Sequence, residues 1–237
     1  MRPVIIALDF QNQPQVFQFL DQFPHQDQLM VKVGMEIFYD AGPQILRELQ
    51  ARKLRVFLDL KLYDIPHTVE QAMVQLGRQG VAMVTVHAAG GATMIAAAKR
   101  GLLRGSELAG VQPASLLAIT QLTSTSEAQM QTEQLVTADL TTAVTHLAQL
   151  AHANGADGII SSALEDAQIH AATSPNFLCI NPGIRLATDD PNDQQRVVTP
   201  AQAAALGSDG IVVGRSITQA SDPVAAYQQI LQEWERK

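Results

Sequence analysis

The sequence holds a single cysteine, Cys179, among 237 residues, and this excludes an intrachain disulfide. Because Cys179 stands in the apolar stretch NFLCIN, we expect a small buried side chain rather than a reactive thiol. Charged residues make up only 16% of the chain and hydrophobic residues 46%. That balance is typical of a compact folded domain and argues against a disordered chain.

Positive charge is also scarce. The 16 Lys and Arg residues stand against 23 Asp and Glu residues, so the formal net charge is −7. We therefore expect no general nucleic-acid surface, although one local cationic pocket can still bind a phosphate. No apolar run approaches the roughly 18 residues of a membrane span, and no signal-peptide pattern precedes VIIALDF. We expect no membrane contact and a cytoplasmic location.

Short apolar runs, many of them rich in β-branched residues, recur along the chain and predict β-strands. They span residues 4–8, 29–33, 55–60, 82–87, 114–120, 157–161, 177–181 and 210–214. Amphipathic segments that predict helices separate these runs, and the alternation indicates a parallel sheet covered on both faces. Eight such units favour a (β/α)₈ (TIM) barrel over an open doubly wound sheet. We expect a single α/β domain over residues 1–237.

Charged residues stand at the carboxyl ends of the first three predicted strands. Asp9 ends the first, Lys32 lies near the end of the second, and Asp59 and Lys61 end the third, with Asp64 just beyond. Asp59 and Lys61 are two residues apart, so on a strand both side chains leave the same face. One such pair is most simply a structural ion pair. Five charges of alternating sign at the rim where barrel enzymes place their active sites favour catalysis.

A second group of candidate residues follows the seventh and eighth predicted strands. The stretch NPGIR (181–185) leads into a long loop, and the eighth strand ends in VVGRSIT (212–218). Loops at these two positions commonly bind phosphate in this fold. Gly214 lets the backbone approach a ligand closely, and Arg215 can bind a phosphate through two hydrogen bonds. We expect the loop over residues 183–196 to act as a lid.

Several motifs together resemble those of the bacterial-type orotidine 5′-phosphate decarboxylase family. They are DLKLYDIPHT (59–68), VKVG (31–34), PGIR (182–185), DQQRVVTP (193–200) and VVGRSIT (212–218). The similarity covers essentially the whole chain. D-x-K-x-x-D alone is shared with relatives that act on sugar phosphates, whereas its extension to D-I-P-x-T, with the late loop, is particular to the decarboxylase.

The resemblance implies an enzyme that converts orotidine 5′-monophosphate (OMP) to uridine 5′-monophosphate (UMP) and CO₂ in de novo pyrimidine biosynthesis. Such a carboxy-lyase uses no cofactor and no metal. By this resemblance Lys32, Asp59, Lys61 and Asp64 match the family's catalytic lysine–aspartate network, in which Lys61 protonates the product carbon C6.

The resemblance also implies substrate contacts and a partner. Asp9 and Lys32 match contacts to the ribose hydroxyls, and Thr123 matches a contact to the pyrimidine. The residues that match the phosphate-binding region are Pro182, Arg185, Gln194, Gly214 and Arg215. In the family, the residues at the positions of Asp64 and Thr68 reach into the neighbouring subunit's site, which implies a homodimer.

Two other functions remain open. A sugar-phosphate lyase or aldolase of the same superfamily, such as a hexulose-phosphate synthase, would place its carboxylates around Mg²⁺; DIPHT argues against it, and chelator sensitivity distinguishes the two. Asp59, Asp64 and His67 are residue types that bind metals, but Lys61 among them competes with a cation. The second alternative is a non-catalytic binder of nucleotide monophosphates, which has little reason to bury Lys61 between two acids.

Overall fold

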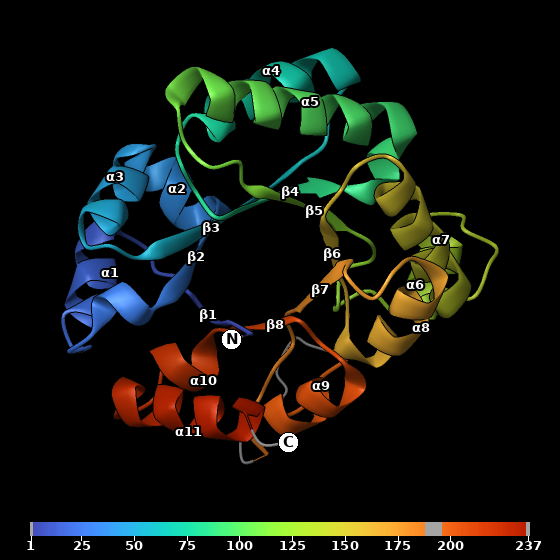
Figure 1. Ribbon diagram of the computed structural model, residues 1–237. Coiled ribbons are helices and arrows are strands. Elements are labelled where there is room, and N and C mark those ends of the chain that lie inside the picture. The colour runs from blue at the N-terminus through green and yellow to red at the C-terminus, as the bar shows by residue number, and fades with distance from the viewer. Residues whose placement is uncertain (1, 188–195, 236–237) are drawn as a thin grey trace.

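The computed structural model describes residues 2–187 and 196–235. Its parallel strands follow one another around a closed barrel in chain order, and the first strand pairs with the last (Figure 1). The strands are β1 (Val4–Ala7), β2 (Met30–Gly34), β3 (Arg55–Leu62), β4 (Met83–His87), β5 (Ser115–Ile119), β6 (Gly158–Ile160), β7 (Leu178–Asn181) and β8 (Gly210–Val213). The predicted (β/α)₈ barrel is confirmed, and each strand lies within about two residues of its predicted run.

Helices surround the barrel as an outer ring (Figure 1). They are α1 (Gln13–Leu20), α2 (Met35–Ala41), α3 (Gln44–Ala51), α4 (Pro66–Gly77), α5 (Gly91–Ala109), α6 (Glu127–Glu133), α7 (Leu140–Ala153), α8 (Asp166–Ala172), α9 (Pro200–Leu206), α10 (Arg215–Thr218) and α11 (Pro223–Glu235), with 3₁₀ turns η1 (Gln26–Gln28), η2 (Ala88–Gly90) and η3 (Ala163–Glu165). Among the helices of residues 2–187 and 196–235, none has the length and apolarity needed to cross a bilayer.

Helices α4 and α5 pack backbone to backbone through glycines. A Cβ atom on Gly101 or Gly105 would lie 2.2 or 2.1 Å from the carbonyl oxygen of Glu70 or Val74. Only glycine fits at such an approach, because any side chain would force the two helices apart. This contact fixes the position of α4, which begins directly after the loop that carries Asp64.

The barrel interior has an apolar layer in its middle. Inward-facing side chains pack there as one cluster, made of Ile5, Ala7, Met30, Phe57, Met83, Leu117, Ile180 and Val212. Successive side chains on a strand alternate between its two faces, so a residue two positions further along points the same way. The residues two positions after Ala7, Met30, Phe57 and Met83 are all polar. They form a second layer at the carboxyl end of the barrel.

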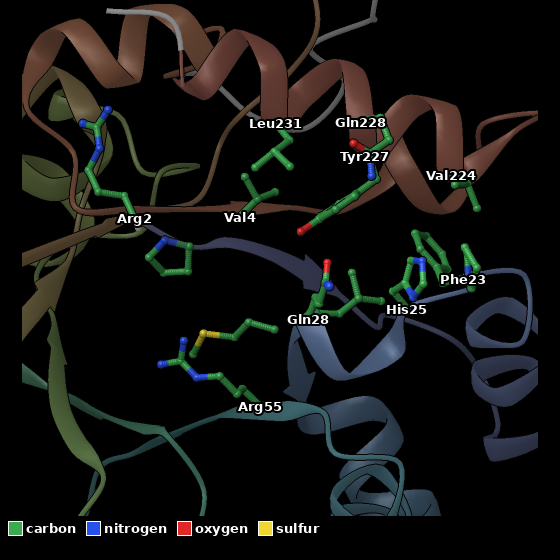
Figure 2. Close-up of a pocket in the computed structure, with 14 residues that line it drawn as sticks. Arg2, Val4, Phe23, His25, Gln28, Arg55, Val224, Tyr227, Gln228 and Leu231 are labelled. Atoms are coloured by element: carbon green, nitrogen blue, oxygen red, sulfur yellow. The ribbon is translucent and has the colours of Figure 1, made fainter.

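The amino-terminal end of the barrel contains a separate cavity of about 260 Å³ (Figure 2). Its walls include Arg2, Val4, His25, Gln28, Arg55 and Tyr227. Arg2 donates hydrogen bonds to the carbonyl oxygens of Ser208 (3.0 Å) and Trp234 (3.4 Å), and its guanidinium lies 4.2 Å above the Trp234 ring. Arg2 therefore ties the start of β1 to the end of α11. This end of a (β/α)₈ barrel serves stability, whereas chemistry occurs at the other end.

A buried polar cluster joins α8 to the last strands. The Asp166 carboxylate accepts hydrogen bonds from Asn181 Nδ2 (2.9 Å) and Ser208 Oγ (2.6 Å). Burial raises the pKa of Asp166 to about 6, and these hydrogen bonds oppose that rise. Asn181 is the last residue of β7, so the cluster fixes the point at which the chain turns into Pro182.

Candidate active site

Four of the five charges predicted at the rim lie in one connected chain of ion pairs. Lys32 Nζ is 2.9 Å from Asp9 Oδ1 and 3.9 Å from Asp59 Oδ2, and Lys61 Nζ is 2.6 Å from the same Asp59 oxygen. Asp59 is only 7% exposed, whereas Asp9 lies at the open end of the chain. In a water-poor setting such charges interact more strongly than in bulk water. The arrangement can therefore stabilise a charge that develops beside Lys61.

Thr85 on β4 holds both Asp59 and the backbone of Lys61. Its hydroxyl donates to Asp59 Oδ1 (2.9 Å) and accepts from the Lys61 N–H (2.9 Å). Sequence reasoning missed this residue, although Thr85 is a polar side chain two positions after the inward-facing Met83. The same alternation that identified Asp59 could have found it.

Lys61 is placed by an irregularity that strand alternation does not predict. Its φ angle is +54°, and the pairing of β3 with β4 shifts between Leu58 and Leu62. A non-glycine residue in the left-handed region costs about 1–2 kcal/mol, so the surrounding contacts must hold it there. Backbone strain of this kind often occurs at functional sites. Here it aims the Lys61 side chain back at Asp59.

Asp64 and Thr68 lie apart from the ion-pair chain. Both are exposed, and the Asp64 carboxylate accepts a hydrogen bond from the Ile65 N–H (2.6 Å). Within residues 2–187 and 196–235, no ion pair joins Asp64 to a lysine. The apolar side chains on either side of Asp64 are also exposed, Tyr63 by 64% and Ile65 by 66%.

Two adjoining cavities open above the ion-pair chain. The first, about 280 Å³, is lined by Asp59 and Lys61 and by Leu122, Thr123 and Ser124 of the loop after β5. Thr123 is buried there, so a flat group that enters this cavity contacts both Lys61 and this loop.

The second cavity, about 350 Å³, is lined by the residues predicted to bind phosphate. Its walls include Asp9, Lys32, Pro182, Gly183, Arg185, Gly214 and Arg215. It shares Asp9, Lys32, Pro182 and Val212 with the first cavity. A ligand with an anionic group at one end and a ring at the other can therefore occupy both cavities, with its middle over Asp9 and Lys32.

The predicted lid lies partly outside the described residues, and so does Gln194. The described ends of this loop are joined to each other. The Arg185 N–H donates to the Val198 carbonyl (3.1 Å), and the Val198 N–H donates to the Gly183 carbonyl (3.2 Å). This pairing fixes both ends of the loop at the mouth of the second cavity.

His87, the last residue of β4, borders the site from the side of Tyr63. The two rings lie 5.8 Å apart between centroids. Burial lowers the pKa of His87, and the nearby Lys61 charge lowers it further. His87 is therefore neutral at neutral pH and adds no positive charge beside Lys61.

Potential metal ligands come together at one place in the described part of the chain. His170, Cys179 and Asp209 offer ligand atoms within 4.8 Å of one another. The Asp209 carboxylate already accepts the Cys179 N–H (2.8 Å) and pairs with His170 (3.2 Å). Cys179 is buried, as predicted, and burial raises the pKa of its thiol. This group joins β7 to the start of β8 and does not line either cavity at the rim.

Comparison with known proteins gives consistent matches over the whole chain. Residues 2–230 match the model of the orotidine 5′-phosphate decarboxylase / HUMPS family. The orotidine 5′-phosphate decarboxylase of Latilactobacillus sakei subsp. sakei is 58% identical over 98% of each chain. The enzyme of the same name from Lactiplantibacillus plantarum is 54% identical over 98% of each. The crystal structure of orotidine 5′-phosphate decarboxylase from Lactobacillus acidophilus superposes with a TM-score of 0.89 at 42% identity and covers both chains fully.

Proposed function

The chain belongs to the orotidine 5′-phosphate decarboxylase / HUMPS family, and we propose that it decarboxylates OMP with Lys61 as the proton donor to C6. The products are UMP and CO₂, and the reaction belongs to pyrimidine biosynthesis. The observation that carries the assignment of roles is the Asp9–Lys32–Asp59–Lys61 chain of charges beneath two adjoining cavities.

The chemistry requires electrostatic help at one carbon atom. When the bond between C6 and the carboxylate breaks, CO₂ leaves and the electron pair stays on C6 in an sp² orbital. No adjacent carbonyl or cofactor ring delocalises that pair directly. The Lys61 ammonium, held 2.6 Å from Asp59, can stabilise the developing carbanion and then transfer a proton to it. The neutral Lys61 amine then takes up a new proton from solvent, so each turnover consumes one proton.

Asp59 has two roles in this proposal. It keeps Lys61 charged and oriented, because the two groups form a short ion pair inside a mostly buried site. It also lies on the side where the substrate carboxylate would sit, and two like charges close together disfavour the bound ground state. Lys32, whose ammonium lies near both Asp9 and Asp59, bridges the two carboxylates and offsets their mutual repulsion.

The two cavities support one orientation of the substrate. The pyrimidine ring occupies the cavity over Lys61, against Thr123, and the ribose hydroxyls contact Asp9 and Lys32, which line both cavities. The phosphate occupies the other cavity, where Pro182, Arg185, Gly214 and Arg215 surround it. Gln194 completes the proposed phosphate contacts.

OMP turnover in the presence of EDTA tests this function. We expect the ultraviolet absorbance change of OMP conversion to proceed at the same rate with EDTA as with added Mg²⁺, because two lysines stand where a catalytic cation would bind. No conversion by the folded protein would refute the decarboxylase. Activity that appears only with Mg²⁺ would favour the metal-dependent lyases of the superfamily, and sugar phosphates would then be the substrates to test.

We further propose that the enzyme works as a homodimer in which Asp64 and Thr68 complete the site of the neighbouring subunit. Asp64 is exposed, and within residues 2–187 and 196–235 it forms no ion pair with a lysine, which supports a role outside its own site. Tyr63 and Ile65 flank it as large exposed apolar side chains, and a partner surface would remove them from water.

Mixed dimers test this sharing of residues. Lys61→Ala and Asp64→Ala chains should each be inactive alone, while a dimer of one of each regains one complete site, with about half the wild-type rate per dimer. The matched control pairs Lys61→Ala with Asp59→Ala: both residues act within one subunit, so no complete site forms. The measurement is OMP turnover after the variants are mixed and exchanged. Activity no higher in the first mixture than in the control would exclude the shared site.

A further inference from the structure

Arg196 connects three parts of the barrel that are distant in sequence. Its Nη1 forms an ion pair with Glu165 Oε1, and its Nη2 donates to the backbone carbonyl oxygens of Leu122 (2.9 Å) and Gln121 (3.5 Å). Both charged side chains are largely buried. A guanidinium can make these contacts together because its donors point outward in a rigid planar fork.

Glu165 is a fixed anchor for Arg196. It closes the capping box of η3, where its Oε2 accepts the Ser162 N–H (3.1 Å) and leaves Oε1 for Arg196. Burial raises the pKa of Glu165, and the Arg196 charge opposes that rise. Since an unpaired buried charge is costly, the pair holds the guanidinium in one place.

The backbone of Arg196 is also fixed close by. Two residues further on, Val198 bridges to Ile184 and exchanges hydrogen bonds with Gly183 and Arg185. Thr199 then caps α9 with its side chain. Both the backbone of Arg196 and the guanidinium at the end of its side chain are therefore held in place.

Arg196 holds the loop that lines the cavity proposed to receive the pyrimidine ring. Residues 121–124 leave the end of β5, and Leu122, Thr123 and Ser124 line the cavity that contains Lys61. The two carbonyl oxygens bound by Arg196 come immediately before Thr123. A shift of these carbonyls would move Thr123 relative to Lys61.

We propose that Arg196, held by Glu165, positions the loop 121–124 as the wall against which the pyrimidine ring binds. This inference rests on the proposed function of the site. Arg196 acts through the two backbone carbonyls and does not touch the ring, so it is a positioning residue rather than a catalytic one. Its effect is confined to ligands that carry the base.

Calorimetric binding of two ligands to Arg196→Met tests this role. UMP occupies both cavities, whereas ribose 5-phosphate lacks the ring. We expect the dissociation constant of UMP to rise at least about 10-fold, the effect of losing hydrogen bonds from a charged donor, while that of ribose 5-phosphate stays unchanged. Arg196→Lys keeps a charge for Glu165 but has one nitrogen in place of two, so it cannot bind Glu165 and the two carbonyls as arginine does, and it should give an intermediate rise for UMP.

The matched control is Arg100→Met, which breaks an Arg–Glu pair of 2.7 Å with Glu70 on the outer helices. It should change neither constant. Equal losses for both ligands in Arg196→Met, or no loss for UMP, would overturn the inference. Thermal melting verifies that each variant is folded, and Arg196→Lys decides the question if the methionine variant is not. Absence of OMP turnover by the wild type would instead refute the proposed function, so the two failures are distinguishable.

Discussion

Lys61→Ala is expected to lower kcat by at least about 10⁴-fold, because it removes both the proposed proton donor and the positive charge proposed to stabilise the carbanion. The variant should still fold. Asp59 keeps the hydrogen bond from Thr85 (2.9 Å) and the Lys32 ammonium at 3.9 Å, so the carboxylate is not left unpaired. The measurement is single-turnover conversion of OMP, followed by absorbance.

Lys99→Ala is the matched control for this variant. Lys99 pairs with Asp157 at 2.6 Å, the same distance as Lys61 to Asp59, and its side chain is 23% exposed against 27% for Lys61. Asp157 lies just before β6, at the amino-terminal end of the barrel. Lys99→Ala should keep the wild-type kcat. A Lys61→Ala enzyme that retained more than about a tenth of the wild-type kcat would show that another group donates the proton.

Sequence reasoning predicted those parts of the fold that follow from the local periodicity of hydrophobic residues. The apolar runs gave the strands, and their alternation with helices gave the barrel. Asp9, Lys32 and Asp59 were predicted to meet because the carboxyl ends of parallel strands share one rim, and their ion pairs bear this out. Thr85 follows the same alternation and was within reach of the same reasoning.

Other features depend on contacts that no local pattern records. Lysine has no preference for the left-handed region, so the stretch KLYD does not predict the φ of +54° at Lys61. Glu165 and Arg196 are 31 residues apart and meet only because β6, β7 and the loop after β7 close side by side. In the proposed dimer, Asp64 acts in the site of a second chain, so no pattern in its own sequence identifies its contacts.

Arg215→Ala is expected to lower kcat/KM for OMP by about 10³-fold, although Arg215 lines the cavity proposed to hold the phosphate and not the cavity lined by Lys61. A guanidinium binds phosphate through two charge-assisted hydrogen bonds, and loss of both accounts for an effect of that size. Phosphate takes no part in the bond changes at C6. Its binding energy can still serve catalysis, because it offsets the entropy that is lost when the ring is fixed over Lys61.

Orotidine, which lacks the phosphate, separates this role from a general loss of structure. If Arg215 acts through the phosphate alone, Arg215→Ala should hardly change kcat/KM for orotidine. Arg52→Ala removes an arginine that is paired with Asp21 at 2.5 Å on the outer surface. It should leave kcat/KM unchanged for both OMP and orotidine. Equal losses for OMP and orotidine would mean that Arg215 supports the site itself. A fall in kcat/KM for OMP alone would mean that Arg215 binds the phosphate, while the charges around Lys61 act on the ring.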